Sequence, residues 1–189
     1  MDKKDIKRSK FLSMVLRHLP ESVGLTLDQN GWIDVRKLLS ACAKKGVIIS
    51  PECLERIVET NDKKRFAFNE DRTKIRASQG HSVSVDLLLK PTAPPEYLYH
   101  GTAMHFLSSI QNRGLVKGRR QHVHLSHDVV TAIQVGRRHG DPVVLKVLAK
   151  DMMDNGYLFY VSDNGVWLTD HVPSVYLVQE DRKGTHSDR

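Results

Sequence analysis

Cysteine is scarce in this chain, and long apolar runs are absent. The only two cysteines among 189 residues, Cys42 and Cys53, have no metal-ligand spacing and form no disulfide framework. We therefore predict that both are buried small apolar residues and that the protein works in a reducing, cytoplasmic compartment. No apolar stretch approaches the roughly 18–20 residues that span a bilayer. The charged start, MDKKDIKRSKF, lacks the features of a signal peptide, which argues against secretion.

Charge is unevenly distributed between the two halves of the chain. Residues 1–90 contain 18 Lys and Arg against 12 Asp and Glu, whereas residues 91–189 contain 11 against 10. A basic excess on one half indicates an electrostatic surface for a polyanion, with RNA or DNA as the leading candidates. A basic surface that only aids solubility is the alternative, and charge alone does not decide between the two.

The first ninety residues predict three helices. Apolar side chains at helical spacing mark the first helix, within residues 3–19, and Pro20 ends it. Two further amphipathic segments, residues 33–46 and 50–62, predict the second and third helices. The apolar stripe predicted for the first helix consists of Ile6, Phe11, Met14, Val15 and Leu16.

Polar residues mark the starts of the later helices, and alternating residues predict a hairpin after them. Asp34 lies near the start of the second helix, while Ser50 is the predicted N-cap of the third and Pro51 its first residue. A short strand is predicted at residues 24–27. Two alternating segments within residues 65–78 predict a β-hairpin around a central turn. Three helices closed by a hairpin are the order of a winged-helix module, which we predict for residues 1–90.

The residue pattern changes after residues 91–96. This segment contains three prolines, which predict a stiff linker. Beyond it, short apolar segments separated by Gly, Asp and Asn predict a small mixed domain dominated by strands, residues 97–180. The tail, residues 181–189, is predicted to be disordered. The predicted strands lie within residues 97–102, 122–126, 143–149, 158–163, 165–169 and 175–178, and the helices within 103–114 and 128–140.

Histidines gather in the segment QHVHLSHD, residues 121–128. On a strand His122 and His124 share one face, and a His-x-His strand can bind zinc. Zinc needs further ligands, and the sequence offers no HExxH-type helix and no supporting arrangement of acidic residues. Both cysteines lie in the other predicted domain. We therefore predict that no metal is bound here.

Two polar groups in the first half are candidate anion contacts. Arg17 and His18 stand side by side at the end of the first helix, and Arg76 lies in an alternating strand. The polar turn after that strand, residues 79–82, can present backbone N–H groups and side-chain donors to an anion. Basic residues that only complement the helix dipole, and an ordinary loop after a hairpin, are the alternatives for each group alone.

Seven motifs taken together resemble one enzyme family. They are SKFLSMVLRHLP, GW, IRASQGHS, LYHGT, VHLS, VGRRHG and NGVWLT. Their order and spacing resemble those of the NAD-dependent RNA 2′-phosphotransferases of tRNA splicing, including bacterial members. The resemblance covers about residues 5–178. It implies an α+β protein with an N-terminal winged-helix lobe for RNA, a C-terminal ADP-ribosyltransferase-like lobe for NAD, and an active site in the cleft between them.

The resemblance also implies which residues form the site. The catalytic set would be Arg17, His18, Arg76 and Arg137, the last chosen over Arg138. NAD would be bound by His100, Gly101, Thr102, His124 and Ser126. The RNA or its phosphate would be bound by Lys10, Gln79, His81, Ser82 and Arg138. In this alignment His122 and His127 lie outside the matched core.

The implied reaction has two steps. The RNA 2′-phosphate attacks the ribose C1″ of NAD and expels nicotinamide, and the ribose 2″-OH then attacks phosphorus. The products are 2′-OH RNA and ADP-ribose 1″,2″-cyclic phosphate. Arginine forks suit such a phosphate, and His18 is the candidate for proton transfer. Many ADP-ribosyltransferases carry a late glutamate where this chain has Val166, and an anionic acceptor has little need of that base.

Two rival functions remain open at this point. One is an ADP-ribosyltransferase that modifies terminal phosphates of nucleic acid without the second step. The other is a non-catalytic winged-helix protein that binds RNA or DNA and senses NAD. In each case we expect a monomer without a membrane partner. The physiological RNA does not follow from the sequence.

Overall fold

The computed structural model describes residues 2–180, so the tail predicted at residues 181–189 lies outside the described residues. The chain divides into two compact units. Within the described residues, unit 1 consists of residues 2–90, 118–121 and 162–165, and unit 2 of residues 91–117, 122–161 and 166–180. Two short segments of the second half of the sequence therefore belong to the same unit as the N-terminal helices.

Helices and antiparallel strands occur in both units, which confirms the α+β class. The winged-helix and ADP-ribosyltransferase-like architectures, and the functions assigned to the two domains, stay predictions. No helix within residues 2–180 is long and apolar enough to cross a membrane.

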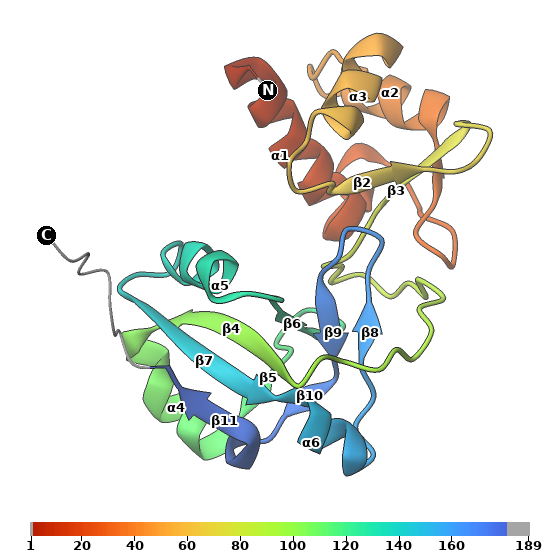
Figure 1. Cartoon of the computed structure of the whole chain (residues 1–189). Helices are drawn as coiled ribbons and strands as arrows, with labels where there is room; N and C mark the ends of the chain where they lie inside the picture. Colours follow the sequence, from red (N-terminus) through yellow and green to blue (C-terminus); the bar gives the residue numbers. More distant parts are fainter. Residues whose placement is uncertain (1, 181–189) are drawn as a thin grey trace, which may run out of the picture. The chain divides into compact units, whose positions relative to one another are not determined.

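Unit 1 is built on three α-helices that begin at side-chain caps. They are α1 (Lys3–Arg17), α2 (Val35–Lys44) and α3 (Pro51–Glu59), with the short 3-10 helix η1 (Pro20–Val23) after α1 (Figure 1). The Asp34 carboxylate accepts a hydrogen bond from the backbone N–H of Lys37, 2.9 Å away. The Ser50 hydroxyl accepts one from the backbone N–H of Cys53 at 3.2 Å. The predicted N-cap Ser50 is therefore confirmed, and Asp34, predicted only to lie near the start of its helix, is an N-cap as well.

The apolar stripe predicted for the first helix is correct in its second half and wrong at its start. Val15 and Leu16 are buried in the core of unit 1, whereas Ile6 is 43% exposed. The core-facing positions of the first two turns carry polar residues instead, Asp5 at 2% and Ser9 at 1% exposure. Polar side chains can occupy such positions when they find hydrogen-bond partners inside the protein.

A small antiparallel sheet completes unit 1. Its order is β1 (Ile33–Asp34), β3 (Lys74–Ala77), β2 (Phe66–Phe68), and Ala67 pairs with Arg76 across the hairpin. The predicted hairpin is thereby confirmed. The strand predicted at residues 24–27 is wrong, because the segment forms no ladder, and Leu25 and Leu27 instead pack as single side chains against the core.

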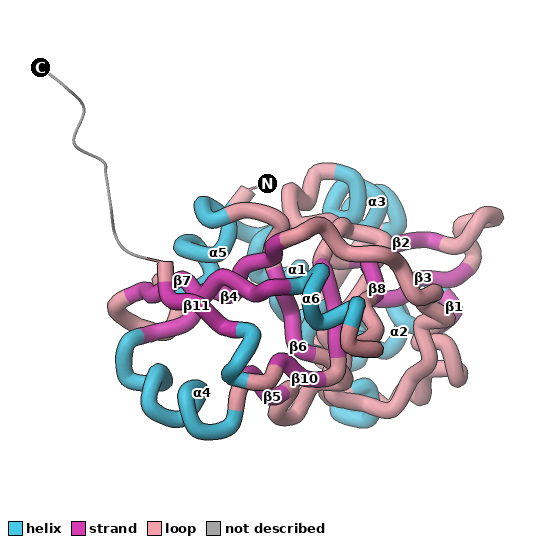
Figure 2. The backbone as a smooth tube through the Cα atoms, turned by 60° about the horizontal axis from the view of Figure 1, so that its bottom comes forward, coloured by secondary structure: helices cyan, strands magenta, loops and turns pink. Residues whose placement is uncertain are grey.

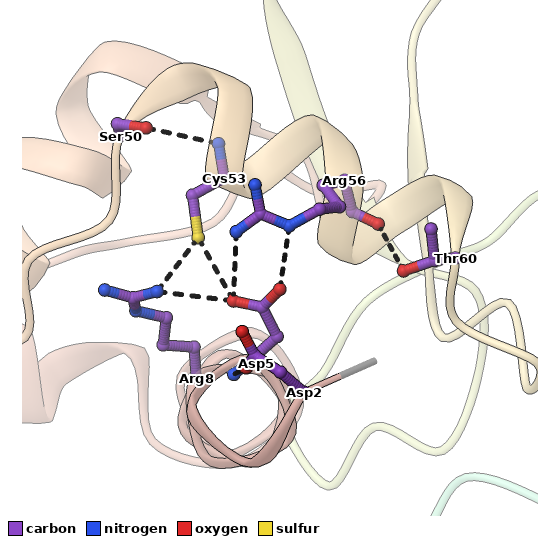
Figure 3. A network of polar contacts seen from close by, with 7 residues as sticks. All are labelled: Asp2, Asp5, Arg8, Ser50, Cys53, Arg56 and Thr60. Atoms are coloured by element: carbon purple, nitrogen blue, oxygen red, sulfur yellow. Dashed lines mark hydrogen bonds and ion pairs between the residues drawn. The ribbon is translucent and has the colours of Figure 1, made fainter.

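A charged network joins α1 to α3 inside unit 1 (Figure 3). The Arg56 guanidinium donates to both carboxylate oxygens of Asp5, at 2.9 and 3.3 Å, and Arg8 donates at 3.3 Å. The hydrogen bond from Arg56, together with those from Cys53 and Arg8, outweighs burial and lowers the pKa of Asp5 to about 2. Both cysteines are free and buried, as predicted, although the Cys53 thiol also donates to Asp5 at 3.4 Å.

Unit 2 is built around an antiparallel sheet of order β11 (Leu177–Gln179), β7 (Pro142–Leu148), β4 (Tyr97–Ala103). Helix α5 (Val129–Gly136) lies along β4 and β7, and α4 (Leu107–Arg113) lies on the other side of this sheet beside β11 (Figures 1 and 2). These strands and helices were predicted. Helix α5 begins directly after Asp128, the first residue of the helical segment predicted at 128–140, and the Asp128 carboxylate caps it by accepting from the Thr131 N–H at 2.7 Å.

A second sheet of unit 2 has the order β6 (Val123–Leu125), β9 (Trp167–Thr169), β8 (Tyr160–Val161). Sequence patterns had predicted its strands as longer segments. Elements that they missed are the strand pair β5 (Leu115–Val116) and β10 (His171–Val172), and the helix α6 (Ala149–Asp154). Short 3-10 helices are η2 (Met104–Phe106) and η3 (Ser174–Tyr176). Phe159, Leu98 and Leu125 are among the buried side chains of the core.

Candidate active site

The C-terminal end of α1 places Arg17 and His18 at the rim of unit 1. The backbone N–H groups of His18 and Leu19 both donate to the Met14 carbonyl at 3.0 Å, and the helix then gives way to η1 at Pro20. His18 is thus the C-cap of a helix whose preceding turn is packed into the core. This local geometry orients both side chains toward residues that are distant in the sequence.

Arg17 is the most constrained cation of the site. One terminal nitrogen donates to the Arg65 carbonyl at 3.4 Å, whereas Nε is buried and has no hydrogen-bond partner among the described residues. Burial, followed by the positive charges of Arg65 and Arg120, lowers the pKa of Arg17 to about 10. Arg17 stays charged at neutral pH but lacks a compensating carboxylate among the described residues.

Arg65 is held beside Arg17 by two buried polar side chains. Its guanidinium donates to Ser9 Oγ at 3.3 Å and to Asn61 Oδ1 at 3.5 Å. Asn61 Nδ2 also donates to Ser9 Oγ at 3.0 Å. Burial of Ser9 in α1, which contradicted the predicted apolar stripe, thus serves to position an arginine. Sequence reasoning missed Arg65, since it read this residue only as the start of a hairpin strand.

The segment after the hairpin is attached to the end of α1. The Ser82 N–H donates to the Arg17 carbonyl at 2.8 Å, and Ser82 Oγ lies 2.9 Å from His18 Nδ1. Gln121 joins the other side of this segment through its N–H to the His81 carbonyl at 3.3 Å and its Nε2 to the Val85 carbonyl at 2.7 Å. These contacts place residues 118–121 in unit 1.

Arg120 is the second arginine that the sequence analysis missed. It lies in the segment anchored by Gln121, and its positive charge helps to lower the pKa of both Arg17 and His18. For His18 the causes, in order, are burial, Arg17 and Arg120. The pair of arginines before QHVHLS was the available pattern, but nothing local links it to a helix about a hundred residues earlier.

His81 is the most deeply buried histidine of the site, at 1% exposure. Neither ring nitrogen has a hydrogen-bond partner among the described residues. Burial, then the charges of Arg17, His18 and Arg76, lowers the pKa of His81 to about 4. The imidazole is therefore neutral at pH 7 and can donate one N–H and accept one hydrogen bond.

Arg76 lies between an aromatic ring and a carboxylate. Its guanidinium carbon is 4.5 Å from the centre of the Trp32 ring, and one terminal nitrogen is 3.0 Å from Asp163 Oδ2. The Nε atom is buried without a hydrogen-bond partner in the described part of the chain. The cation–π contact and the ion pair together hold the guanidinium in place.

Four buried nitrogen atoms thus lack partners in the described part of unit 1: Arg17 Nε, Arg76 Nε, His81 Nδ1 and His81 Nε2. Leaving a buried polar group unpaired costs about 1–3 kcal/mol each, and like charges in the same place add repulsion. Such an arrangement favours a bound anion that accepts these hydrogen bonds and neutralises the arginines. We use the name cation cluster for the four arginines and two histidines gathered here, including the neutral His81: Arg17, His18, Arg65, Arg76, His81 and Arg120.

Other predicted residues lie outside these contacts. Lys10 is exposed on α1, and Gln79 is partly buried in the loop after β3. Arg137 and Arg138 are exposed at the end of α5, in unit 2, where Arg137 is the helix C-cap. The helix ends at Gly136, four residues before the predicted stop at Gly140.

Unit 2 brings three of the predicted NAD contacts together. Tyr99 and Ser126 exchange backbone hydrogen bonds of 2.9 and 2.7 Å, which sets β4 beside β6. In this register His100 Nδ1 donates to the His124 carbonyl at 3.0 Å. His100, His124 and Ser126 are all partly exposed, with His100 in the middle of β4, His124 in the neighbouring β6 and Ser126 directly after β6.

Packing against α5 explains why residue 101 is a glycine, whereas the sequence analysis had assigned this glycine to NAD binding. A Cβ atom built on Gly101 would lie 1.7 Å from the Ala132 carbonyl oxygen of α5, far inside van der Waals contact. The close backbone approach at Gly101 is therefore made by this helix. Thr102, the next residue, is buried at the same strand–helix contact.

No group of three or more His, Cys, Asp or Glu side chains that could hold a metal ion occurs in the described residues, those of QHVHLSHD included. His122 is partly buried, and its ring centre lies 5.7 Å from that of Tyr160. Burial is the main cause that lowers the pKa of His122. His127 is exposed.

Known proteins resemble the chain over most of its length. A family model described as RNA 2′-phosphotransferase, Tpt1 / KptA family, matches residues 3–171. A probable RNA 2′-phosphotransferase of Flavobacterium johnsoniae is 59% identical over 169 residues, which cover 89% of this chain and 93% of that protein. Proteins of the same description from Acaryochloris marina and Hahella chejuensis are 53% and 55% identical. Those two matches cover 90% and 94% of this chain and 94% and 95% of the relatives.

Proposed function

The chain belongs to the RNA 2′-phosphotransferase family, which confirms the resemblance seen in its seven motifs, and we propose that it transfers an internal RNA 2′-phosphate to NAD. It is accordingly a transferase that removes a 2′-phosphate from RNA. NAD as the acceptor, the steps of the reaction and the residues that carry them are the substance of the proposal.

The proposed reaction has two steps that balance. An oxygen of the RNA 2′-phosphate forms a bond to the ribose C1″ of NAD, and the bond from C1″ to nicotinamide breaks. The ribose 2″-OH then attacks the phosphorus, loses its proton, and the bond from phosphorus to the RNA 2′-oxygen breaks. That oxygen takes up a proton, which gives 2′-OH RNA and ADP-ribose 1″,2″-cyclic phosphate.

The cation cluster supplies what a phosphate needs in both steps. Arg17 and Arg76 present buried Nε–H donors without partners among the described residues, and Arg65 and Arg120 add positive charge beside them. Preorganised donors of this kind stabilise charge that develops on phosphorus without reorganisation. This group of unpartnered donors among arginines is the single observation that carries the proposal.

His18 is our candidate for the proton that the leaving 2′-oxygen requires. In the free protein burial and the neighbouring arginines lower its pKa, which favours the neutral ring. A bound phosphate dianion opposes those arginines and favours the imidazolium. Phosphate binding would therefore charge His18 before the first step, and the anionic diester formed in that step would keep it charged for the second step, when a general acid is needed.

Three polar residues on or next to β4 and β6 of unit 2 fit the role of NAD contacts. His100, His124 and Ser126 lie on adjacent strands and offer hydrogen bonds to ribose hydroxyls or to the nicotinamide amide. For Gly101 and Thr102 the packing against α5 is a sufficient explanation, so we give them a supporting place beneath those contacts. We assign no step to Arg137 or Arg138, while Lys10 and Gln79 stay candidate RNA contacts.

The test is to incubate the protein with NAD and a short RNA that carries an internal 2′-phosphate. We expect loss of the phosphate together with release of nicotinamide and ADP-ribose 1″,2″-cyclic phosphate. An ADP-ribosylated RNA that persists would show a transferase limited to the first step. Unchanged RNA would contradict the proposal and favour a protein that only binds nucleic acid.

A further inference from the structure

Ser82 has a hydroxyl contact that the catalytic roles above do not use. We propose that Ser82 is a positioning residue that holds the His18 ring through Nδ1 and thereby directs Nε2 to the RNA 2′-oxygen. The inference rests on the proposed function. It differs from the direct phosphate or RNA contact that the family resemblance implies for this serine.

The hydroxyl is fixed by the backbone as well as by the ring. Ser82 Oγ lies 2.9 Å from His18 Nδ1, while the Ser82 N–H donates to the carbonyl of Arg17 at 2.8 Å. Val83 N–H donates to the same carbonyl at 3.4 Å. Two residues of one loop are therefore bound to the last turn of α1, and the hydroxyl keeps its place relative to His18 even though it is exposed.

The contact leaves one ring nitrogen for chemistry. With Nδ1 engaged by Ser82, Nε2 is the nitrogen that can reach a substrate. A general acid must carry protons on both nitrogens, so in that state Nδ1–H donates to the serine oxygen and Nε2–H faces the leaving group. A hydroxyl suits both states of the ring, because it can either donate or accept.

The surroundings of His18 make this neutral partner important. Arg17 and Arg120 disfavour the imidazolium, and His81 interacts electrostatically with His18 from the neighbouring loop. None of these groups can accept a hydrogen bond from a protonated His18 Nδ1, except the neutral His81 ring, for which no such contact occurs in the described residues. The serine oxygen is thus the acceptor that offsets part of the repulsion.

The experiment compares Ser82→Ala with Ser82→Thr, which keeps a hydroxyl, and with Ser84→Ala, a nearby exposed serine without a hydrogen bond in the described structure. Single-turnover assays follow both steps with NAD and the 2′-phosphorylated RNA across pH 5 to about 9. The His18 pKa is followed in the free proteins by NMR titration of the ring. Thermal unfolding checks that each variant is folded.

We expect Ser82→Ala to slow the second step about 10-fold or more, as loss of a hydrogen bond to a charged group would. Its His18 pKa should fall, with an equal shift of the pH profile, while KM for NAD stays unchanged. Ser82→Thr should restore both readouts, and Ser84→Ala should behave as the parent protein.

An unchanged His18 pKa with a raised KM for RNA would make Ser82 a substrate ligand and overturn the inference. A slower second step that Ser82→Thr does not restore would overturn it too. If the parent protein shows no turnover with NAD, the proposed function fails on its own. The NMR titration then still decides whether Ser82 controls the ring: a fall in the pKa supports the contact, and no change removes it.

Discussion

The two ends of helix α1 each gather arginines, but a carboxylate pairs with those of the N-terminal end, whereas Arg17 at the C-terminal end has no carboxylate partner among the described residues. At the N-terminal end Arg8 and Arg56 share Asp5, and the hydrogen bond to this carboxylate is the largest cause that raises the pKa of Arg56 (Figure 3). At the C-terminal end Arg17 is surrounded by further cations, and its pKa is lowered to about 10. The same residue type is stabilised as a cation at one end and destabilised at the other.

The difference separates a network that is satisfied within the protein from a cluster that we propose binds phosphate, and we call the N-terminal and C-terminal ends of α1 the structural end and the binding end. Around Asp5 the carboxylate oxygens and the guanidinium nitrogens satisfy one another, so the network needs no further partner. Around Arg17 the unpaired nitrogens and the repulsion reduce the stability of the free protein, and a bound phosphate would remove both costs. Perturbed pKa values occur at both ends, so only their direction and the missing partner distinguish them.

The largest effect should come from exchanging an arginine at the binding end. Because Arg17 would donate to the phosphate in both steps, we expect Arg17→Ala to lower single-turnover rates about 10²- to 10³-fold, the usual range for one oxyanion donor. Arg8→Ala, on the same helix, should stay within about twofold in rate, because Arg8 contacts Asp5 and not the cation cluster. Equal losses of activity in the two variants would break the distinction between the ends.

The second expected effect is a loss of folding stability in acid, caused by the buried His81 ring. The unfolded chain protonates this ring near its ordinary pKa of 6.5, whereas the folded protein keeps it neutral down to about 4. Stability present above pH 6.5 should therefore be lost as the pH falls to about 4. One unit of pKa corresponds to about 1.4 kcal/mol, so the loss should approach about 3 kcal/mol.

Urea unfolding at a series of pH values checks this loss. His81→Gln should flatten the free energy of unfolding between pH 6.5 and 4 relative to the parent protein. His127→Gln, which exchanges an exposed histidine, serves as the control. If His81→Gln keeps the full pH dependence, another group is responsible and His81 is not held neutral by its surroundings.

The third expected effect is a loss of stability when the Asp5 carboxylate, at the N-terminal end of α1, is removed. We expect Asp5→Asn to lower the free energy of unfolding by about 2 kcal/mol at pH 7, because hydrogen bonds to charged groups are worth about 1.5–3 kcal/mol. In the parent protein the carboxylate stays charged down to about pH 2, whereas the unfolded chain protonates it near 3.8. Its contribution is therefore present above pH 4 and lost between about 4 and 2.

Denaturation of the parent protein and Asp5→Asn between pH 7 and 2 separates this window from that of His81. The curves should converge as the pH falls from about 4 to 2, and single-turnover rates of the folded variant at pH 7 should match the parent's. A constant difference at all pH values would show that the asparagine disturbs packing and not the charged network.

Some of the elements and residues behind this contrast could be predicted from the sequence, and others could not. Local residue types account for the caps at Asp34 and Ser50, because a cap depends on neighbours within a few positions. The same holds for the hairpin and for the strand that carries His124. Arg17 and His18 were noticed for the same reason, as a basic pair before a proline. Local chemistry therefore predicted most of the elements and marked four of the six residues of the cation cluster, namely Arg17, His18, Arg76 and His81 in the polar turn of residues 79–82.

Long-range partners explain what was missed. Arg65 joins the cluster because Ser9 and Asn61 hold it, and both have to be buried against the usual preference of polar residues. Arg120 joins because Gln121 binds the loop after β3. The apolar period placed Ile6 in the core, whereas Asp5 takes that face with partners from α3. No local pattern reports partners about fifty residues away.

The smallest expected effect is the gain in stability when a phosphate anion binds at the C-terminal end of α1. Inorganic phosphate should stabilise the folded protein, because it can accept the unpaired N–H groups and neutralise the arginines. At ten times its dissociation constant the gain would be about 1.4 kcal/mol. Thermal unfolding at pH 7 measures it, with sodium chloride at equal ionic strength as the reference.

Variants at the two ends of α1 make this test specific. Asp5→Asn should start from a lower melting temperature and keep the full phosphate-dependent rise, since its change leaves Arg17 untouched. Arg17→Ala should lose most of the rise, because it removes an unpartnered donor and one of the clustered charges. A rise of equal size in Arg17→Ala would mean that phosphate acts elsewhere on the basic surface. The contrast between the two ends would then reflect repulsion alone and not a binding site.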